Sequence, residues 1–423
     1  MNYLKIDGGC RLRGRVQISG AKNSALKLMA SSLLGHGETT LTNVPRISDV
    51  LTMIEVLQRL GARVGFDGDV LTIDTSGEIS TVAPYDLVRR MRASINVLGP
   101  LLARAGHARV AMPGGCNIGS RTIDMHESGL AQLGVRFTFD HGYLEGIADR
   151  LVGKRVLLEF PSRGATENLM TAAVRAEGVT VIENAAREPD IVDLASFLNA
   201  MGAQVWGAGT STIEITGVRQ MHSTSYRVSA DPIEAGTFAL AVLTTGGEAE
   251  LVGAQPETME IFLEKLELAG AEWAPTDGGI RVTADHRARS VDFATLPYPG
   301  FPTDLQPQMM AYLTTAEGTS IVTENVFENR FAHAQELIRM GADIRTEGHH
   351  AVIRGVRRLQ GAPVKGSDLR AGAALVVAGL GAEGQTEVHD FHHVERGYED
   401  FAGKLQGLGA SVELAEETTS LPV

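Results

Sequence analysis

A glycine-rich segment around Cys116 contains the residue types best suited to chemistry. Cys116 follows Pro113-Gly-Gly and stands five positions before Arg121. Flanking glycines let a backbone approach a ligand closely, and a neighbouring guanidinium favours the reactive thiolate form of a cysteine. No histidine lies close in sequence to act as a base for this thiol. The segment therefore predicts a functional cysteine that acts as a general acid or contacts a ligand.

Positive charges recur at the starts of predicted helices. Lys22, Arg92 and Arg370 each stand where a largely apolar helix begins. A cation there opposes the helix dipole by roughly 0.3–1 kcal/mol, whereas a bound anion would be attracted by both the cation and the helix end. The pattern therefore predicts an anionic ligand. Three further arginines precede predicted outer helices at matching positions: Arg121, Arg330 and Arg396.

Six glycines at regular intervals indicate how those helices are organised. Each glycine ends a helical segment and is followed by a small residue and a strand, and neighbouring members are 68 to 73 residues apart. Glycine is favoured there because the residue that closes a helix often takes the left-handed conformation. Six such closures at nearly constant spacing indicate an internal repeat. They are Gly61, Gly134, Gly202, Gly270, Gly341 and Gly409.

Each repeat is predicted to contain an inner helix, a strand, an outer amphipathic helix, and a strand or hairpin. The inner helices predicted over residues 24–34, 93–103, 166–176 and 371–380 are apolar nearly throughout, which is typical of buried helices. The second repeat has about four extra residues within 111–122, the segment that contains the cysteine. An insertion into a repeat usually forms a loop, often on the binding face.

The repeats also predict the domain organisation. A chain of 423 residues is too long for one ordinary core, and six repeats divide naturally into three per domain. We expect an α/β protein with one domain over residues 21–230, which carries repeats one to three and the cysteine loop. The second domain is expected over residues 1–20 and 231–423, with residues 2–20 forming a strand that completes it. The active site is expected in the cleft between the domains.

The composition limits the possible partners and the compartment. The formal net charge of −13 argues against nucleic acid or an anionic membrane as a general partner, and no apolar run is long enough to cross a membrane. Two cysteines cannot form a disulfide scaffold, which favours the cytoplasm. The pairs His349-His350 and His392-His393 fall in polar turns without zinc-ligand spacing, so no metal is expected. The tail from Glu416 onward is expected to be disordered.

Several segments together resemble one family over essentially the whole chain. The sequence resembles the UDP-N-acetylglucosamine 1-carboxyvinyltransferases of the EPSP synthase-like superfamily. The matching segments are Gly20-Ala-Lys-Asn-Ser-Ala, Met91-Arg-Ala-Ser, Pro113-Gly-Gly-Cys-Asn-Ile-Gly-Ser-Arg, Glu183-Asn-Ala-Ala-Arg-Glu-Pro-Asp-Ile-Val-Asp, Phe301-Pro-Thr-Asp, Thr323-Glu-Asn-Val-Phe-Glu-Asn-Arg, Ser367-Asp-Leu-Arg and Glu395-Arg-Gly-Tyr-Glu.

This resemblance implies a fold and a reaction. The fold is a two-domain inside-out α/β barrel with three repeats per domain. The reaction transfers the enolpyruvyl group of phosphoenolpyruvate to the 3-hydroxyl of UDP-N-acetylglucosamine and releases phosphate, which is the first committed step of peptidoglycan precursor synthesis. No cofactor is implied, because phosphoenolpyruvate is a co-substrate that the loop cysteine can carry covalently. Fosfomycin alkylates that cysteine in the family.

The resemblance also implies roles for individual residues. Lys22, Arg121 and Arg396 are implied contacts of the phosphoenolpyruvate phosphate, and Arg370 of its carboxylate. Cys116 is the implied acid that protonates the enol methylene carbon.

Other matching positions are implied on the acceptor side. Asn23 and Asp304 are implied at the sugar 3-hydroxyl, with Asp304 as the base, and Arg92 and Arg330 are implied as further cationic contacts. The implied sugar-nucleotide and cleft-lining residues are Arg121, Thr122, Ile123, Asp124, Met125, Pro161, Ser162, Arg163, Gly164, Asp304, Val326, Asp368 and Leu369.

Two positions depart from the family pattern and leave alternatives open. Thr122 stands where proline is usual, and Arg163 stands where a small apolar residue is usual. Arg163 either adds a phosphate contact or alters which nucleotide sugar fits. The alternatives are an enolpyruvyl transferase for another nucleotide sugar, the sister enzyme acting on shikimate 3-phosphate, which lacks the cysteine loop, and a non-catalytic sugar-nucleotide-binding paralogue. The sequence does not indicate an oligomeric state.

Overall fold

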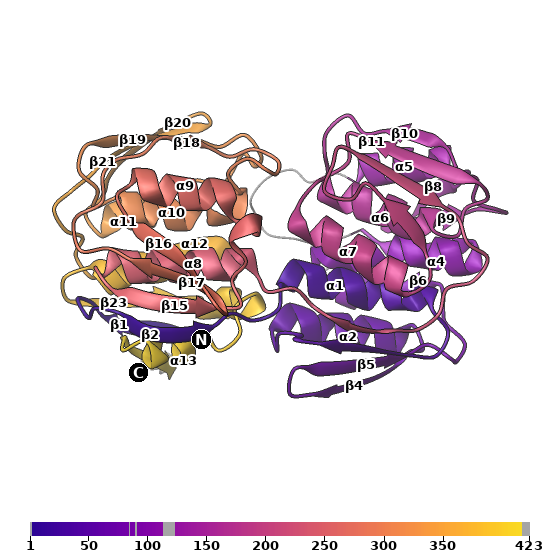
Figure 1. Ribbon diagram of the computed structural model, residues 1–423, viewed down its shortest axis with the longest axis horizontal. Coiled ribbons are helices and arrows are strands. Elements are labelled where there is room, and N and C mark those ends of the chain that lie inside the picture. Colours follow the sequence, from indigo (N-terminus) through magenta and orange to yellow (C-terminus); the bar gives the residue numbers. More distant parts are fainter. Residues whose placement is uncertain (1, 84, 89–90, 113–122, 417–423) are drawn as a thin grey trace, which may run out of the picture. The chain divides into compact units, whose positions relative to one another are not determined.

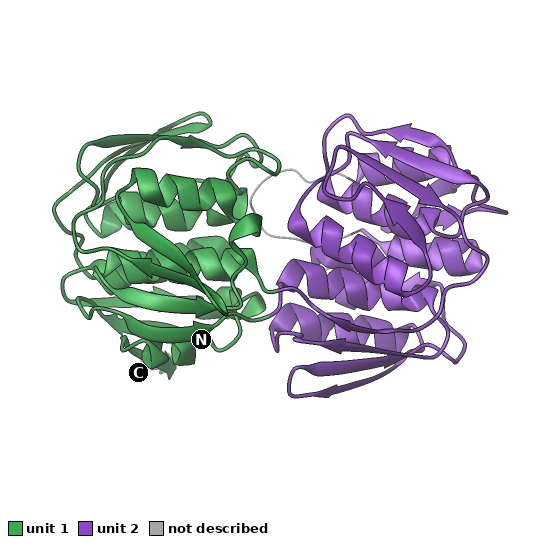
Figure 2. Cartoon of the chain, viewed as in Figure 1, with its two compact units in different colours: residues 1–19, 117–120, 230–423 green, residues 20–116, 121–229 purple. Residues whose placement is uncertain are grey.

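The chain forms two compact units with separate apolar cores. The computed structural model describes residues 2–83, 85–88, 91–112 and 123–416. Unit 1 contains residues 2–19 and 230–416, and unit 2 contains the described part of residues 20–229 (Figure 2). The core of unit 1 runs from Leu4 to Val412 and that of unit 2 from Ala25 to Val228. Among the described residues, none of the helices reaches the length and hydropathy that a bilayer crossing requires.

Unit 2 contains three repeats of an inner helix and an outer helix with four strands. Its elements are α1 (Lys22–Ser31), η1 (Ser32–Leu34), β3 (Glu38–Thr42), α2 (Ser48–Arg59), β4 (Arg63–Asp67), β5 (Val70–Asp74), β6 (Val82–Ala83), α3 (Tyr85–Val88), η2 (Arg92–Val97), α4 (Leu98–Ala105), β7 (His107–Ala111), α5 (Asp124–Gln132), β8 (Arg136–Asp140), β9 (Tyr143–Ile147), β10 (Arg155–Leu157), α6 (Arg163–Ala173), β11 (Val179–Glu183), α7 (Pro189–Ala200), β12 (Gln204–Trp206), β13 (Thr212–Thr216) and β14 (Ser225–Arg227).

Unit 1 contains the other three repeats and the start of the chain. Its elements are β1 (Asn2–Asp7), β2 (Arg13–Gln17), α8 (Pro232–Thr244), β15 (Glu248–Val252), η3 (Pro256–Thr258), α9 (Glu260–Leu268), β16 (Glu272–Thr276), β17 (Gly279–Thr283), β18 (Phe293–Ala294), η4 (Thr303–Leu305), α10 (Gln306–Leu313), β19 (Thr319–Thr323), α11 (Ala334–Arg339), β20 (Asp343–Glu347), β21 (His350–Arg354), β22 (Pro363–Lys365), α12 (Leu369–Gly381), β23 (Gln385–His389), η5 (Phe391–Arg396), α13 (Phe401–Gly407) and β24 (Ser411–Glu416).

The repeats place helices inside and sheets outside, as the inside-out barrel predicts. In unit 1, helices α8, α10 and α12 pack against one another in the interior, and the sheets lie around them (Figure 1). Every residue of α10 is buried, and so is α12 from Leu369 to Leu380. A helix without a polar face can be stable only in such surroundings. The predicted fold class is therefore confirmed.

The described strands form six four-stranded sheets with one common topology. In the third repeat, β10 runs parallel to β11, with Arg155 opposite Val181. Strand β11 pairs antiparallel with β13, with Val181 opposite Glu214, and β13 pairs antiparallel with β12. Because parallel strands need a crossover connection, the inner helix α6 links β10 to β11. Helix α6 therefore begins shortly after the end of the edge strand β10, and the predicted site residues Ser162, Arg163 and Gly164 lie at this start.

The six predicted helix closures are confirmed. Each of the six glycines has a positive φ between 91° and 105°. After α2, the Gly61 amide donates to the Gln58 carbonyl and the Ala62 amide to the Leu57 carbonyl. This pair of hydrogen bonds is the Schellman motif, and it recurs after α5, α7, α9, α11 and α13. The glycine spacing in the sequence therefore reports six equivalent helix ends.

The start of the chain differs from the prediction. Residues 2–20 were expected as one strand, but they form two strands in different sheets. Strand β1 lies between β23 and β24, with Leu4 opposite Val388 and Leu414. Strand β2 runs parallel to β15. The chain turns between them at Gly8 and Gly9, where Gly9 has a φ of 91°, a conformation that favours glycine.

The second inner helix also differs from the prediction of one helix over 93–103. It begins as the 3-10 segment η2, and the α-helix α4 starts only at Leu98. Pro100 explains the position of this start, because proline has no amide hydrogen to donate and is tolerated only in the first turn of a helix.

Candidate active site

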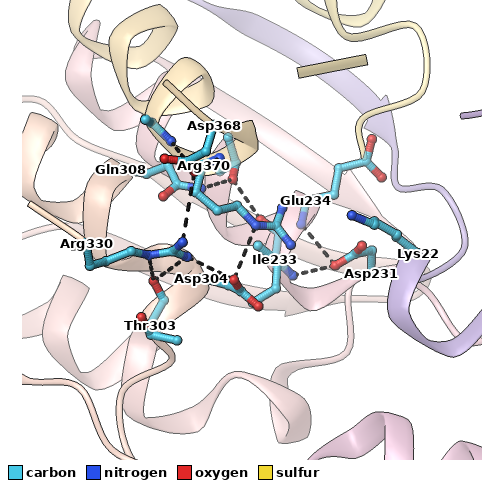
Figure 3. A network of polar contacts seen from close by, with 12 residues as sticks. Lys22, Asp231, Ile233, Glu234, Thr303, Asp304, Gln308, Arg330, Asp368 and Arg370 are labelled. Carbon is cyan, nitrogen blue, oxygen red and sulfur yellow. Dashed lines mark hydrogen bonds and ion pairs between the residues drawn. The ribbon is translucent and has the colours of Figure 1, made fainter. Parts of the chain in front are cut away.

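The densest cluster of predicted site residues in unit 1 surrounds Asp304. This residue lies in η4, immediately before the inner helix α10. Its Oδ1 accepts a hydrogen bond from Arg330 Nη2 at 2.9 Å and lies 3.5 Å from Arg370 Nε (Figure 3). Arg330 Nε and Nη2 also donate to the Thr303 carbonyl, at 3.1 and 3.0 Å. The carboxylate is thus held beside two guanidinium groups from different repeats.

Both arginines of this cluster are buried. Arg330 is 3% exposed and Arg370 is 4% exposed. As an isolated residue, Arg330 would be expected on the surface, and its matching repeat position was the sequence evidence against that expectation. Arg330 Nη1 also lies 3.9 Å from Asp368 Oδ1. Buried charges need such partners, because an unpaired ion in the interior is strongly destabilising.

Asp368 connects this cluster to the start of α12. It is the N-cap residue of that helix, and its Oδ1 accepts from the Arg370 and Ala371 amides at 2.9 and 3.2 Å. The neighbouring Leu369 is buried in the core of unit 1. A carboxylate at the N-cap offsets the unfavourable position of the Arg370 charge near the helix start. Both residues therefore have structural roles at a predicted site position.

Glu324 was not singled out from the sequence, although it belongs to the same cluster. This buried carboxylate accepts from the Thr303 hydroxyl at 3.2 and 3.1 Å. It also accepts from the amides of Val326 and Phe327, at 2.8 and 3.1 Å. Glu324 thereby ties the turn that carries the half-buried Val326 to the turn that carries Asp304. Only its place in the Thr323-Glu-Asn segment could have identified it.

Arg396 is the last residue of η5 and is half-buried. Its positive charge is among the influences on His393, whose pKa is lowered chiefly by burial and then by His392 and Arg396. The Arg396 charge therefore acts on the His393 imidazole.

In unit 2, Lys22 is the first residue of α1, as the sequence predicted for a cation at a helix start. Its Nζ lies 2.8 Å from Asp49 Oδ2, and Asp49 is in the first turn of α2. The next residue, Asn23, is half-buried. A carboxylate partner holds the Lys22 ammonium group where the helix dipole alone would disfavour it.

Predicted site residues of the second repeat lie near His126, which is buried in α5. Burial lowers the pKa of His126 to about 4, with a further lowering by Arg92 and an opposing effect of Asp124. Arg92 opens η2, Asp124 opens α5 and Ile123 is the buried N-cap residue of α5. Met125 packs against the core of unit 2.

Gly164 belongs to the same surroundings. It lies in the first turn of α6, where a Cβ atom would come within 2.9 Å of the His126 ring. Asn168 Nδ2 donates to His126 Nδ1 at 3.0 Å. Gly164 therefore has a packing role against this imidazole. The half-buried Ser162 caps α6 by accepting from the Ala165 amide, and Pro161 precedes it.

Arg163 contacts carboxylates of its own unit. Its Nε lies 3.5 Å from Glu188 Oε1 and its Nη1 3.6 Å from Asp190 Oδ2. Asp190 also contacts Lys27, whose Nζ lies 2.7 Å from Glu167 Oε1. Burial raises the pKa of Glu188, and the Arg163 charge opposes this change. The residue that departs from the family pattern is thus one member of a buried charge network.

Three predicted site residues lie outside the described residues: Cys116, Arg121 and Thr122. Their roles remain those that the resemblance implies. Within the described part of the chain, no group of three acidic, histidine or cysteine side chains is arranged to hold a metal ion.

Comparisons with known proteins agree on one family. The family model described as EPSP synthase (3-phosphoshikimate 1-carboxyvinyltransferase) matches residues 6–405. A UDP-N-acetylglucosamine 1-carboxyvinyltransferase from Mycobacterium bovis is 54% identical over 408 residues, which are 96% of this chain and 98% of the relative. A UDP-N-acetylglucosamine 1-carboxyvinyltransferase 2 from Carboxydothermus hydrogenoformans is 53% identical over 415 residues, 98% and 99% of the two chains.

Solved structures show the same fold. The enolpyruvyl transferase NikO from Streptomyces tendae matches with a TM-score of 0.88 and 26% identity, over 98% of this chain and 99% of that chain. An EPSP synthase from Acinetobacter baumannii matches with a TM-score of 0.78 and 19% identity, over 98% and 100%. The chain therefore belongs to the UDP-N-acetylglucosamine 1-carboxyvinyltransferase family, within the EPSP synthase-like enolpyruvyl transferases.

Proposed function

We propose that this enzyme transfers the enolpyruvyl group of phosphoenolpyruvate to the 3-hydroxyl of UDP-N-acetylglucosamine and releases phosphate. The observation that carries the proposal is the identity of 52–54% over nearly the full length to relatives named for this transfer. Since phosphoenolpyruvate is a cytoplasmic metabolite, the proposed reaction belongs in the cytoplasm. The product would enter peptidoglycan precursor synthesis.

The proposed mechanism has two balanced steps. In the first, Asp304 takes the proton of the sugar hydroxyl, the hydroxyl oxygen bonds to C2 of phosphoenolpyruvate, and Cys116 donates a proton to C3. In the second, the C2–O bond to phosphate breaks, the leaving phosphate takes the proton held by Asp304, and one C3 proton passes to the Cys116 thiolate, which restores the carbon–carbon double bond and both side chains. Exclusion of water would protect the intermediate from hydrolysis. The reaction needs neither a metal nor an organic cofactor.

The proposed contacts of phosphoenolpyruvate are made by the cationic residues that the sequence analysis named. Arg370 would bind the carboxylate of phosphoenolpyruvate, and Lys22, Arg121 and Arg396 its phosphate. Arg330 and Arg92 would add positive charge, and Asn23 would contact the sugar hydroxyl. Guanidinium groups already held by carboxylates need little reorganisation when the anion binds, which is the property that electrostatic catalysis requires. The remaining sugar-nucleotide contacts are proposed as the resemblance implies them, except that of Arg163, which contacts Glu188 and Asp190 of its own unit.

The test is phosphate release from phosphoenolpyruvate with a panel of nucleotide sugars. We expect release with UDP-N-acetylglucosamine at an ordinary enzymatic rate and its loss in Cys116→Ser. Fosfomycin should shift the mass of the wild-type chain but not that of Cys116→Ser. A preference for another nucleotide sugar would support the alternative acceptor, and binding without turnover would support a non-catalytic paralogue.

A further inference from the structure

The buried hydroxyl of Tyr398 contacts side chains from three inner helices of unit 1. Tyr398 is 2% exposed and lies between η5 and α13. Its hydroxyl lies 2.8 Å from Thr237 Oγ1 of α8, 3.1 Å from Gln308 Nε2 of α10 and 3.1 Å from Arg370 Nη1 of α12. Neither the proposed reaction nor the residue roles above assign a function to this tyrosine.

The direction of each hydrogen bond follows from the number of protons. Gln308 Nε2 and Arg370 Nη1 can only donate, so the Tyr398 oxygen accepts from both. The Thr237 hydroxyl donates its single proton to the Ile233 carbonyl at 2.8 Å. It must therefore accept the Tyr398 proton, together with a hydrogen bond from Gln308 Nε2 at 3.1 Å. The Tyr398 oxygen consequently presents its lone pairs, and not its proton, to Arg370.

Tyr398 keeps its proton in this environment. Burial raises the pKa of Tyr398, although the Arg370 charge opposes this effect. The Tyr398 ring also lies beside the guanidinium, with its centroid 5.5 Å from the Arg370 Cζ atom. Tyr398 therefore contacts Arg370 through a neutral hydroxyl and through the aromatic ring, and both contacts favour the cation.

These contacts fix the orientation of the Arg370 guanidinium. One edge donates to Tyr398 through Nη1, and Nε faces Asp304 at 3.5 Å (Figure 3 shows Arg370 and Asp304). Within the residues that the structure describes, Nη2 has no acceptor. A guanidinium held in this way can present Nη2 and the second Nη1 hydrogen to one carboxylate, which is the paired geometry that arginine favours.

We propose that Tyr398 is a positioning residue for phosphoenolpyruvate, because its hydroxyl orients Arg370 toward the substrate carboxylate. This inference rests on the proposed function. It predicts a selective effect on one of two substrates. A residue that merely filled the core would instead affect both substrates and the stability of the whole chain.

The test compares Tyr398→Phe with Tyr312→Phe in the full chain. Both tyrosines are buried in unit 1, but the Tyr312 hydroxyl has no hydrogen-bond partner among the described residues. In Tyr398→Phe, loss of a hydrogen bond to a charged group should raise the KM for phosphoenolpyruvate about tenfold. The KM for UDP-N-acetylglucosamine should change less than twofold, and Tyr312→Phe should leave both values unchanged.

A second variant covers the case in which Tyr398→Phe does not fold. Thr237→Val removes the acceptor of the Tyr398 proton, and it should raise the same KM by a smaller factor of about threefold. Equal increases for both substrates, or unchanged KM values with a lowered Tm, would contradict the inference. The wild-type chain separates the two proposals, because absence of phosphate release there would refute the proposed function and not the role of Tyr398.

Discussion

Arg163 allows a prediction at the scale of one residue. Its side chain is 32% exposed and lies beside Glu188 and Asp190. Replacement by methionine keeps much of the aliphatic volume but removes the positive charge between two largely buried carboxylates. We expect Arg163→Met to lower stability by about 1 kcal/mol, or roughly 2–4 °C in Tm. Thermal unfolding would measure this loss.

The same variant distinguishes a structural role from a ligand-binding role. The KM for UDP-N-acetylglucosamine should change less than twofold in Arg163→Met. Arg155→Met is the control, since the exposed Arg155 pairs with Glu183 at 2.8 Å and surface pairs contribute little. A tenfold rise in this KM with an unchanged Tm would show instead that Arg163 contacts the nucleotide sugar.

The site residues show what could be predicted at this scale. Lys22 and Arg370 stand at helix starts, as the sequence predicted, because the apolar pattern of each helix locates its first turn. The partners of these cations could not be predicted. Lys22 contacts Asp49 and Arg370 contacts Asp304, and the two residues of each pair are 27 or more positions apart in the sequence. Local periodicity carries no information about contacts between such distant residues.

At the scale of elements, the glycines that end two outer helices, Gly341 and Gly61, predict different losses of stability on substitution by alanine. Gly341 has a φ of 93° and no atom within 4 Å of an added Cβ, whereas at Gly61 an added Cβ would lie 2.4 Å from the Glu78 carbonyl oxygen. Gly341→Ala should cost about 1 kcal/mol, from the left-handed backbone alone. Gly61→Ala should cost about 1–3 kcal/mol more, because the backbone must also shift. Denaturant unfolding would compare them, and equal losses would contradict this explanation.

Glu234, a buried acidic residue of α8, predicts that the stability of the chain depends on pH. Glu234 is buried and accepts from the Ser19 amide at 2.6 Å, and its Oε1 lies 2.6 Å from Lys404 Nζ. Ser19 is the last residue of unit 1 before the chain enters unit 2. Burial raises the pKa of Glu234 from 4.5 to about 7, Lys404 opposes this shift, and Asp231 adds to it.

The sign of the effect follows from proton binding. Between pH 4.5 and about 7 the folded chain binds more protons at Glu234 than the unfolded chain does, so this residue's contribution to stability falls as the pH rises. The loss amounts to at most about 3 kcal/mol. Glu234→Gln should remove this dependence, so the free energy of unfolding of the wild type relative to the variant should fall from pH 5 to pH 8. Denaturant titrations would measure it, with the exposed Glu248→Gln as the control. A pH-independent difference would contradict the prediction.

At the scale of the whole molecule, the separate cores predict that unit 2 can fold without unit 1. Residues 20–229 contain three complete sheets and the entire core of unit 2. Since a domain with its own core can fold alone, we expect the fragment 20–229 to unfold cooperatively. The shorter fragment 20–220 lacks β14, which pairs with β3 and completes the sheet of the first repeat. It should be less stable, and circular dichroism during thermal unfolding would compare the two. A longer fragment without cooperative unfolding would contradict the prediction.

The sequence by itself determined the repeat, the helix ends and the inner helices. These features are local: a glycine closes each outer helix through hydrogen bonds within six residues, and a helix that is apolar all round must be buried. The recurrence of these local signals was sufficient to predict six α/β repeats with buried inner helices, and the inside-out barrel followed from the family resemblance. The motifs that carry the family resemblance are likewise contiguous segments.

Only the tertiary structure decided which strands complete which sheets and which charges meet. Strand β2 joins β15 from a distance of more than 200 residues, and β14 returns to β3. An edge strand of three to five residues carries too little pattern to specify its partner, so packing of the whole unit makes that choice. The same holds for Tyr398, Thr237, Gln308 and Arg370, which meet only because α8, α10 and α12 pack together. Side-chain contacts between distant segments depend on this packing, and not on the residues that precede or follow each one.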